Sequence, residues 1–368
     1  MTEKSSTSNN PKLGRTLRED LHNINFGDEV KKEYRDLKRF YLSDDQKDRL
    51  KSMKIIKRGF FIFIWLLKSL FLKLTPLRRV FTLLGFILVL SNRIVISNDG
   101  GSSSSNNNSL FGALIILFVL LLELKDKLLA KTELEGGRKV QRALLPEENP
   151  EIHGWKVWLH SEPANEVCGD LVDYLKLSDS NIGLTMADVA GKGLSAALMM
   201  SKLQSTIRAI ANEKDSLAKL AKNINYIFHR DSLPSLFASM LYIQVTPGKG
   251  NLKYVNAGHL PPLILKGDTI KEMPKGDAAI GIMKDSKFSE KKILLRPGEV
   301  FIVYSDGVTE AVNEVGQFFG KERLINTIKK YKDLPADKLG EAITRQVEFF
   351  SGNAPRSDDL SLIVLKRE

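Results

Sequence analysis

Aspartates placed in tight turns recur across the C-terminal two-thirds of the chain. They lie in the runs Cys168-Gly169-Asp170, Asp188-Val189-Ala190-Gly191-Lys192-Gly193, Ser305-Asp306-Gly307 and Ser357-Asp358-Asp359-Leu360-Ser361. Most of these runs begin or end an apolar segment with the composition of a β-strand. Carboxylates brought together from distant segments supply the oxygen ligands that Mg²⁺-like ions bind. The runs therefore indicate metal-assisted phosphate chemistry.

The run from Asp188 to Gly193 carries the strongest single signal. Asp188 ends an apolar stretch, and the glycines allow the backbone to approach a ligand closely. A helix is predicted to follow from Leu194, with its positive end toward the site, which suits a phosphate. The spacing is not that of a P-loop. Lys192 is a candidate phosphate contact, although an exposed lysine at a helix start without such a role is an equally good interpretation.

Phosphate monoester hydrolysis needs positive charge beside the phosphoryl oxygens and a source of hydroxide at neutral pH. Two divalent cations would supply both, with a metal-activated water as the nucleophile. No nucleophilic Ser, Cys or His is then required. The chain has five histidines in 368 residues, which disfavours zinc chemistry based on His ligands. We expect no cofactor other than the metal ions.

Charge and cysteine content bound the remaining function classes. The single cysteine, Cys168, excludes an intramolecular disulfide, fits a reducing compartment and is interpreted as a packing residue. The net charge of +11 is uneven: residues 1–150 contain 26 Lys+Arg and 17 Asp+Glu, and the remainder 29 and 27. Basic residues around apolar segments indicate an anionic membrane surface rather than nucleic acid.

The first 124 residues are predicted to form a partly disordered cytosolic region, 1–54, and a membrane region. Apolar segments follow at 60–74, 80–96 and 110–124. Lys68 and Lys73 allow the first to lie in the membrane interface or to span, whereas the other two are interpreted as a spanning helical hairpin. Basic residues outside both ends of the hairpin place those ends in the cytoplasm. The alternative is that all three are core helices of a soluble domain.

Residues 125–149 are predicted to form a charged linker helix. Leu128, Leu134 and Leu144 are candidates for a seam between two copies, although fewer than three clean heptads are present. Gly136-Gly137 is expected to interrupt the helix, at about 1 kcal/mol for each glycine relative to alanine. Pro146 and Pro150 are expected to end it. A homodimer through this segment is therefore a hypothesis.

From residue 150 the pattern changes to short apolar runs separated by Gly and Pro turns, which predicts an α+β fold in which helices flank an antiparallel β-sandwich. The predicted strands cover 155–160, 171–177, 182–186, 238–245, 252–256, 263–265, 291–295, 300–305 and 360–366, and the predicted helices 195–212, 216–229, 321–331 and 336–350.

With Asn256-Ala257-Gly258-His259 added, the order and spacing of these motifs resemble the SpoIIE/RsbU-type branch of the metal-dependent protein phosphatases (PPM). The resemblance extends from Arg138 to Glu368, and the segment 138–146 is similar to the approach to that domain. It implies a β-sandwich with helices outside and two Mn²⁺ or Mg²⁺ ions in a cleft at one edge. Cys168 and Ser361 depart from the family pattern, which has Gly and Thr there.

The resemblance also implies a role for each acid. Asp188 would bridge both ions, Asp170 and the Val189 carbonyl would join the second, and Asp306 and Asp358 would hold the first. Asp359 is adjacent and could exchange roles with Asp358. Asp173 is interpreted as a support behind these ligands, with a surface residue as the alternative. His259 is interpreted as a residue that fixes a turn, with contact to substrate as the alternative.

These features predict a membrane-anchored serine/threonine protein phosphatase with its catalytic domain in the cytoplasm, at the inner membrane. The resemblance suggests that the substrate is a phosphorylated STAS-like anti-sigma-factor antagonist in a partner-switching pathway. A catalytically silent pseudophosphatase that binds a partner is the alternative. A transporter component would need more polar residues within the spans. No nucleic-acid partner is expected.

Overall fold

The computed structural model describes residues 46, 49–50, 53–91, 108–178, 181–213, 216–233 and 236–368. The chain divides into two compact units, Met1–Lys127 and Leu128–Glu368, which are described separately. The predicted disorder at the N-terminus and most of the polar connector between the last two apolar segments lie outside the described residues.

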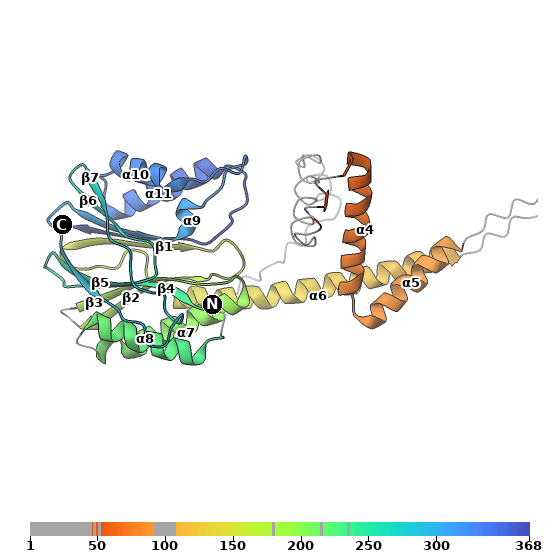
Figure 1. The fold of residues 1–368 in the computed structure, drawn as a ribbon, viewed down its shortest axis with the longest axis horizontal. Coiled ribbons are helices and arrows are strands. Elements are labelled where there is room, and N and C mark those ends of the chain that lie inside the picture. Colours follow the sequence, from red (N-terminus) through yellow and green to blue (C-terminus); the bar gives the residue numbers. More distant parts are fainter. Residues whose placement is uncertain are drawn as a thin grey trace, which may run out of the picture. The chain divides into compact units, whose positions relative to one another are not determined.

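Two antiparallel sheets form the larger unit (Figure 1). Both sheets have five strands within the described part of the chain. In spatial order, the first contains β1 (Trp155–Glu162), β10 (Leu360–Arg367), β9 (Val300–Tyr304), β6 (Leu263–Lys266) and β7 (Thr269–Glu272). The second contains β2 (Asp170–Ser178), β3 (Asn181–Val189), β4 (Ala238–Val245), β5 (Asn251–Ala257) and β8 (Glu290–Leu294).

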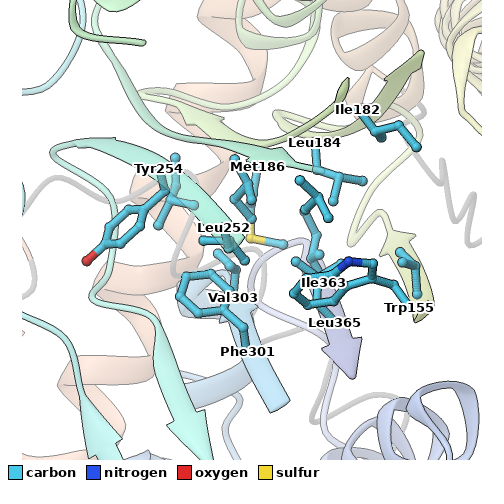
Figure 2. Packing of buried hydrophobic residues seen from close by; sticks show 14 of the residues in the cluster. Trp155, Ile182, Leu184, Met186, Leu252, Tyr254, Phe301, Val303, Ile363 and Leu365 are labelled. Carbon is cyan, nitrogen blue, oxygen red and sulfur yellow. The ribbon is translucent and has the colours of Figure 1, made fainter. Parts of the chain in front are cut away.

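Apolar side chains from both sheets meet in one buried layer (Figure 2). Leu184 and Met186 of β3 belong to the same cluster as Phe301 and Val303 of β9 and Ile363 of β10. These side chains are fully buried. Alternate residues of each strand point into this layer, as a half-buried pleated strand requires. The antiparallel β-sandwich predicted from the sequence is confirmed.

Helices cover both outer faces of the sandwich (Figure 1). The sheet that contains β3 is covered by α7 (Leu194–Ile210) and α8 (Leu217–Asp231), with the short η1 (Ala211–Glu213) between them. The other sheet is covered by α9 (Asp306–Thr309), α10 (Gly320–Lys330) and α11 (Ala336–Ser351). The result is a four-layer helix–sheet–sheet–helix arrangement, as α+β packing predicts.

The smaller unit contains α4 (Ile55–Lys73), α5 (Pro76–Leu90) and the start of α6 (Asn108–Leu144). Arg78 of α5 forms ion pairs with Glu123 at 2.6 Å and Asp126 at 2.7 Å on α6. A Cβ added to Gly112 would overlap backbone atoms of α5 beside Gly85, so the two helices approach closely there.

Three predictions for the first half of the chain need correction or stay open. The helix α6 is continuous through Gly136 and Gly137, so the predicted interruption was wrong. The free-energy cost of the two glycines is too small to break a helix of 37 residues. The second apolar segment forms a helix only to Leu90, and residues 92–96 lie outside the described residues. Among the helices that the structure describes, none is both long and apolar enough to span a bilayer.

Candidate metal centre

Strand pairing brings the predicted acids together. In the β2–β3 register Asp170 lies opposite Asp188, so both side chains point to the same face of the sheet, toward the layer between the sheets. In the other sheet the end of β9 meets the start of β10, where the Ser305 amide donates to the Ser361 carbonyl at 3.0 Å. Asp306 follows β9 and Asp358 precedes β10, so both acids lie at this edge.

Asp359 joins the two sheets. One of its carboxylate oxygens accepts from the Ala164 amide at 2.7 Å, and the other accepts from the Gly169 amide at 2.7 Å and the Asp170 amide at 3.4 Å. The residue is buried. The Asp359 carboxylate is thus hydrogen-bonded to the backbone that leads into β2, and Asp359 positions Asp170.

Asp358 has a different environment. Its side chain is 42% exposed and forms an ion pair with Lys192 at 2.9 Å, and Lys192 also donates to the Ser357 carbonyl at 2.9 Å. No backbone amide from the other sheet binds the Asp358 carboxylate in the described residues. Asp358 is therefore the better placed of the two adjacent acids to bind an exchangeable cation.

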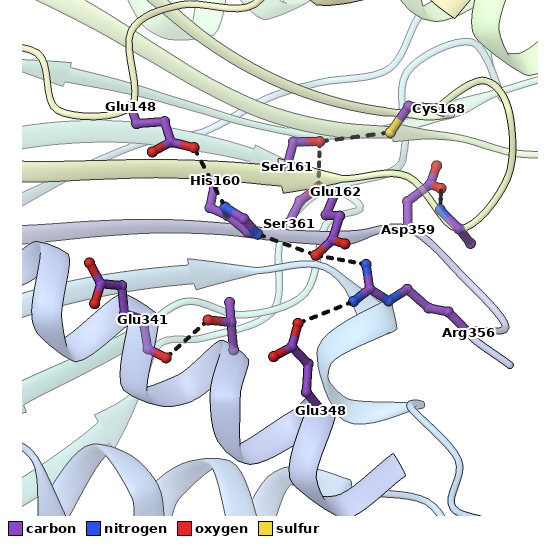
Figure 3. A network of polar contacts seen from close by, with 12 residues as sticks. Glu148, His160, Ser161, Glu162, Cys168, Glu341, Glu348, Arg356, Asp359 and Ser361 are labelled. Carbon is purple, nitrogen blue, oxygen red and sulfur yellow. Dashed lines mark hydrogen bonds and ion pairs between the residues drawn. The ribbon is translucent and has the colours of Figure 1, made fainter. Parts of the chain in front are cut away.

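A row of hydroxyl groups runs from Ser305 through Ser361 to Ser161. Figure 3 shows the end of this row at Ser361, Ser161 and Cys168. The Ser305 hydroxyl donates to the Asp359 carbonyl and accepts from the Ser361 amide, both at 3.0 Å. The Ser361 hydroxyl donates to the Ser161 hydroxyl at 3.1 Å, and Ser161 lies 3.7 Å from the Cys168 sulfur. This row connects the end of β9, the start of β10, the end of β1 and the loop before β2. Serine at position 361 retains the hydroxyl that a threonine would supply.

The carboxylates raise one another's pKa values. Burial, with the neighbouring charge of Asp188, raises the pKa of Asp170 well above its ordinary value. Burial and the charges of Asp306 and Asp358 raise the pKa of Asp188 to about 6, and burial with Asp358 raises the pKa of Asp306. Lys192 opposes both of the last two shifts. Negative charge accumulated in a partly buried space is the electrostatic condition that a divalent cation relieves.

These residues fit a metal centre in their donor chemistry. One carboxylate oxygen of Asp170 is buried and has no hydrogen-bond partner in the part of the chain that the structure describes, which is costly for a charged group unless a cation binds it. Within the described ranges, however, no group of three or more His, Cys, Asp or Glu side chains already has the arrangement that would hold an ion. The acids are gathered at one edge of the sandwich, and the Asp358 carboxylate forms an ion pair with Lys192.

Three further predicted residues lie around this centre. Val189 ends β3, and its amide donates to the Gly169 carbonyl at 3.4 Å. Asp173 is buried and forms a two-bond pair with Arg208 of α7, at 2.7 and 2.9 Å. Asp173 is thus not a surface residue: it ties β2 to α7.

His259 is buried behind the site. Its amide and carbonyl both bind the Asn256 side chain, at 2.8 and 3.1 Å, and its Nδ1 lies 2.9 Å from the Ser239 hydroxyl. Ser239 is opposite Asp188 in the β3–β4 register. Gly258 has φ 74°, which favours glycine. His259 therefore helps to fix a turn beside β4, the strand that pairs with the strand of Asp188.

Gln141 of α6 is a contact that sequence reasoning missed. Its side-chain amide donates to the Cys168 carbonyl at 3.0 Å, and its side-chain oxygen accepts from the Cys168 amide at 3.0 Å. The Leu144 carbonyl at the end of α6 accepts from Gln204 and Arg208 of α7, each at 3.0 Å. The helix α6 is thus bound to the loop that carries Asp170. The segment 138–146 was the available signal, but spacing alone could not single out Gln141.

A second polar network supports the loop before Asp358 (Figure 3). Arg356 binds Glu162 of β1 at 2.8 Å and Glu348 of α11 at 3.7 Å. His160 lies 3.8 Å from Glu162 and 4.0 Å from Glu148, and its ring stacks on Trp158. Burial lowers the pKa of His160, against the neighbouring charges of Glu162 and Glu148.

Comparison with known proteins agrees with this architecture. The family described as stage II sporulation protein E (SpoIIE) matches residues 178–368, slightly more than half of the chain. The chain belongs to the SpoIIE family. Asp188, Asp306 and Asp358 lie inside the matched segment, and Asp170 lies eight residues before it.

Relatives and solved structures share the same region with this SpoIIE-family chain. Protein IcfG of Synechocystis is 29% identical over 273 residues, covering 67% of this chain and 43% of that protein. The phosphoserine phosphatase RsbU of Bacillus subtilis is 28% identical over 240 residues, covering 65% of this chain and 71% of RsbU. The chain therefore spans less than half of IcfG.

The SiaA-PP2C domain of Pseudomonas aeruginosa has the same fold, with a TM-score of 0.56 at 20% identity over 66% of this chain and 99% of that domain. The structure of the PP2C phosphatase domain of SpoIIE from Bacillus subtilis, which includes a fragment of its regulatory domain, matches with a TM-score of 0.51 at 17% identity, covering 58% of this chain and 62% of that one.

Proposed function

We propose that this chain is a metal-dependent protein phosphatase that hydrolyses phosphoserine or phosphothreonine. The observation that carries the proposal is the gathering of four acids, Asp170, Asp188, Asp306 and Asp358, at one edge of the sandwich. One buried Asp170 oxygen has no hydrogen-bond partner among the described residues. Membership of the SpoIIE family and the similarity to a phosphoserine phosphatase, RsbU, support the same activity.

In the proposed mechanism, two Mn²⁺ or Mg²⁺ ions would be held by Asp170, Asp188, Asp306, Asp358 and the Val189 carbonyl. Such ions, when bound, neutralise phosphoryl oxygens and lower the pKa of water toward 7. Lys192 is 64% exposed and held by Asp358 and Ser357, so it can exchange these partners for a substrate phosphate. The first turn of α7 follows directly, and the backbone amides at a helix start favour an anion.

The test is hydrolysis of p-nitrophenyl phosphate and of a phosphoserine protein by the full chain, with and without Mn²⁺. Asp188→Asn is expected to reduce the Mn²⁺-dependent rate more than about 100-fold, beyond the loss typical of residues that only support a ligand. Asp285→Asn changes an exposed acid and is the matched control. Full activity of Asp188→Asn would contradict the assignment.

A silent pseudophosphatase that binds a partner is the second candidate. It is favoured by the finding that no metal-holding group is already arranged in the described residues. The same assay separates the two functions, because absence of Mn²⁺-dependent turnover of both substrates by the unaltered chain would leave only the scaffold.

The proposed substrate is a phosphorylated regulatory protein, specifically a STAS-like anti-sigma-factor antagonist in a bacterial partner-switching pathway. The support is the sequence resemblance to the SpoIIE/RsbU-type branch, which extends through the site motifs. Phosphate release from such an antagonist, phosphorylated on serine, tests the substrate class.

We also propose that α6 regulates the site. Gln141 holds the backbone of Cys168 in two bonds, two residues before Asp170, and Leu144 is held by α7. A change in the position or order of α6 would reach Asp170 through these contacts. Pairing of two linker helices is one way to produce such a change, and a homodimer through α6 is part of this proposal.

The N-terminal helices are proposed to attach the enzyme to the inner membrane, with the catalytic domain in the cytoplasm. Their outer surfaces carry many exposed large apolar side chains, among them Phe60, Phe63, Leu90 and Leu117. Exposed apolar surface of this extent is typical of membrane or protein contacts. Basic residues on α4 and at the start of α5 favour an anionic surface.

A further inference from the structure

A small cavity of about 110 Å³ lies beside the candidate metal centre, within the Leu128–Glu368 unit. It is bounded by the end of α11, by the loop from α11 to β10 and by the segment that follows α9. Ala311, Val347 and Leu360 are buried residues of its lining. Gly352 and Pro355, also in the lining, are exposed, so the cavity is open to the surface there.

The cavity and the acid cluster share two backbone segments. Gly307, which lines the cavity, directly follows Asp306. Leu360, which also lines it, begins β10 directly after Asp358 and Asp359. A Cβ added to Gly307 would overlap the Asp359 carbonyl oxygen, so the two segments are in direct contact. The cavity therefore adjoins the place where Asp306 and Asp358 meet.

The size and lining of the cavity suit one aliphatic side chain. Small-molecule sites occupy about 300–1,000 Å³, whereas an apolar cavity of about 150 Å³ is large enough to bind benzene. The charged side chains of the lining, Glu348 and Arg356, lie 3.7 Å apart, and Arg356 also binds Glu162 at 2.8 Å (Figure 3). With these charges paired, most of the wall consists of alanine, valine, proline and leucine side chains.

A phosphoserine side chain is short, and consecutive Cα atoms are only about 3.8 Å apart. A substrate whose phosphate reaches Asp306 and Asp358 therefore lays the residues beside its phosphoserine over the segments that carry these acids. We propose that the cavity binds an aliphatic side chain of the phosphoprotein substrate, from a residue close to the phosphoserine. This inference rests on the hydrolytic activity proposed above and specifies its substrate. A charged side chain at the same substrate position is disfavoured, because its burial without a partner is costly.

The test measures hydrolysis of phosphoserine peptides by the full chain with Mn²⁺. The reference peptide has alanine at the positions beside the phosphoserine, and in each of the other peptides one of these alanines is replaced by leucine. We expect leucine at one position to raise kcat/KM at least about tenfold, which is the lower end of what filling an apolar pocket contributes. Lysine at that position is expected to give no increase over alanine.

Two neighbouring residues of the loop after α11 provide a variant and its matched control. Ala354→Leu fills the cavity from the loop and is expected to lower kcat/KM for the leucine peptide about tenfold, with little change for p-nitrophenyl phosphate. Asn353→Leu adds the same group at an exposed position outside the lining and is expected to keep the preference for leucine.

Two valines of the segment after α9 test the size of the cavity. Val312→Ala enlarges it and is expected to shift the preference from the leucine peptide toward a phenylalanine peptide, a gain that a folding defect cannot produce. Val315→Ala shortens a valine that is 77% exposed and outside the lining, and is expected to keep the preference for leucine. Melting temperatures confirm folding; should Ala354→Leu unfold, Val312→Ala decides the result.

The outcomes separate this inference from the activity on which it rests. If the unaltered chain hydrolyses p-nitrophenyl phosphate but has equal kcat/KM values for all the peptides, the substrate pocket is overturned and the phosphatase activity stands. An unchanged preference for leucine in a folded Ala354→Leu variant would likewise overturn the pocket. Absence of Mn²⁺-dependent hydrolysis of p-nitrophenyl phosphate would contradict the activity itself, and the pocket with it.

Discussion

At the scale of single residues, two adjacent acids have opposite tasks. Asp359 is buried, and its carboxylate accepts hydrogen bonds from three backbone amides. Asp358 is 42% exposed and forms an ion pair with Lys192. The pair Asp358-Asp359 looks equivalent in the sequence. Only the packing of β10 against the loop before β2 distinguishes them.

Substitution of these two acids is therefore expected to separate stability from activity. Asp359→Asn replaces one of the acceptor oxygens facing those amides and should lower the free energy of unfolding by about 2 kcal/mol or more, since buried bonds to a charged acceptor are lost. Asp358→Asn should change stability by less than about 0.5 kcal/mol, as exposed positions do, yet abolish Mn²⁺-dependent hydrolysis. Urea unfolding and the phosphate assay measure the two effects, and equal destabilisation by both variants would contradict this division.

His259 makes stability depend on pH. Burial lowers its pKa to about 4, while the unfolded residue titrates near about 6.5. Between these values the unfolded state binds more protons, so stability is present above pH 6.5 and falls as pH decreases toward 4, by at most about 3 kcal/mol.

Urea midpoints between pH 7 and pH 4.5 test this effect by comparison of variants. His259→Asn is expected to be less stable at pH 7 and to lose less stability on acidification than the unaltered chain. His229→Asn changes an exposed histidine of α8 and should follow the unaltered chain. Parallel curves for His259→Asn and the unaltered chain would show that this imidazole is not buried neutral.

At the scale of elements, the sequence predicted the strands and helices with strong periodicity and missed the weak ones. The strand at 238–245 agrees in both bounds with β4, and all nine predicted strands occur in the sandwich. The missed strand β7 is four largely exposed residues, Thr269–Glu272, at a sheet edge. The missed helix α9 has four residues that begin with Asp306-Gly307, which is typical of a turn.

The candidate site likewise contains residues that the sequence predicts and contacts that it does not. Asp170, Asp188, Asp306 and Asp358 are predictable because each borders a strand whose end is set by local pattern. The contacts of Gln141, Asp359 and Ser305 are not predictable from one sequence, because each joins segments that only tertiary packing brings together.

The contact between α6 and the Asp170 loop makes its own prediction. Gln141→Ala removes both bonds to Cys168, so the loop that carries Asp170 becomes less constrained. We expect the Mn²⁺ concentration for half-maximal hydrolysis to rise about tenfold, the range seen when a support behind a ligand is lost, with a smaller change in rate at saturating Mn²⁺. Thr132→Ala, on an exposed turn of α6, is the matched control. An unchanged Mn²⁺ dependence would show that this contact does not organise the site.

At the scale of the whole molecule, the two units predict separable properties. Residues 128–368 form a compact unit with a complete sandwich, so this fragment is expected to fold alone and to hydrolyse p-nitrophenyl phosphate with Mn²⁺. The exposed apolar surfaces and basic residues of α4–α6 are expected to carry the full chain, and not the fragment, to the top of a density gradient with phosphatidylglycerol vesicles. The proposed attachment would be contradicted if the isolated fragment floated with the vesicles. It would also be contradicted if the full chain stayed at the bottom of the same gradient, separate from the vesicles.

The position of β10 has a consequence for a newly synthesised chain. This strand lies between β1 and β9, and Asp358 and Asp359 immediately precede it. Neither the first sheet nor the acid cluster can close until these last residues leave the ribosome, about 200 residues and on the order of 10 s or more after α6 has emerged. The membrane attachment proposed for α4–α6 would therefore precede the assembly of the acid cluster in a chain under translation.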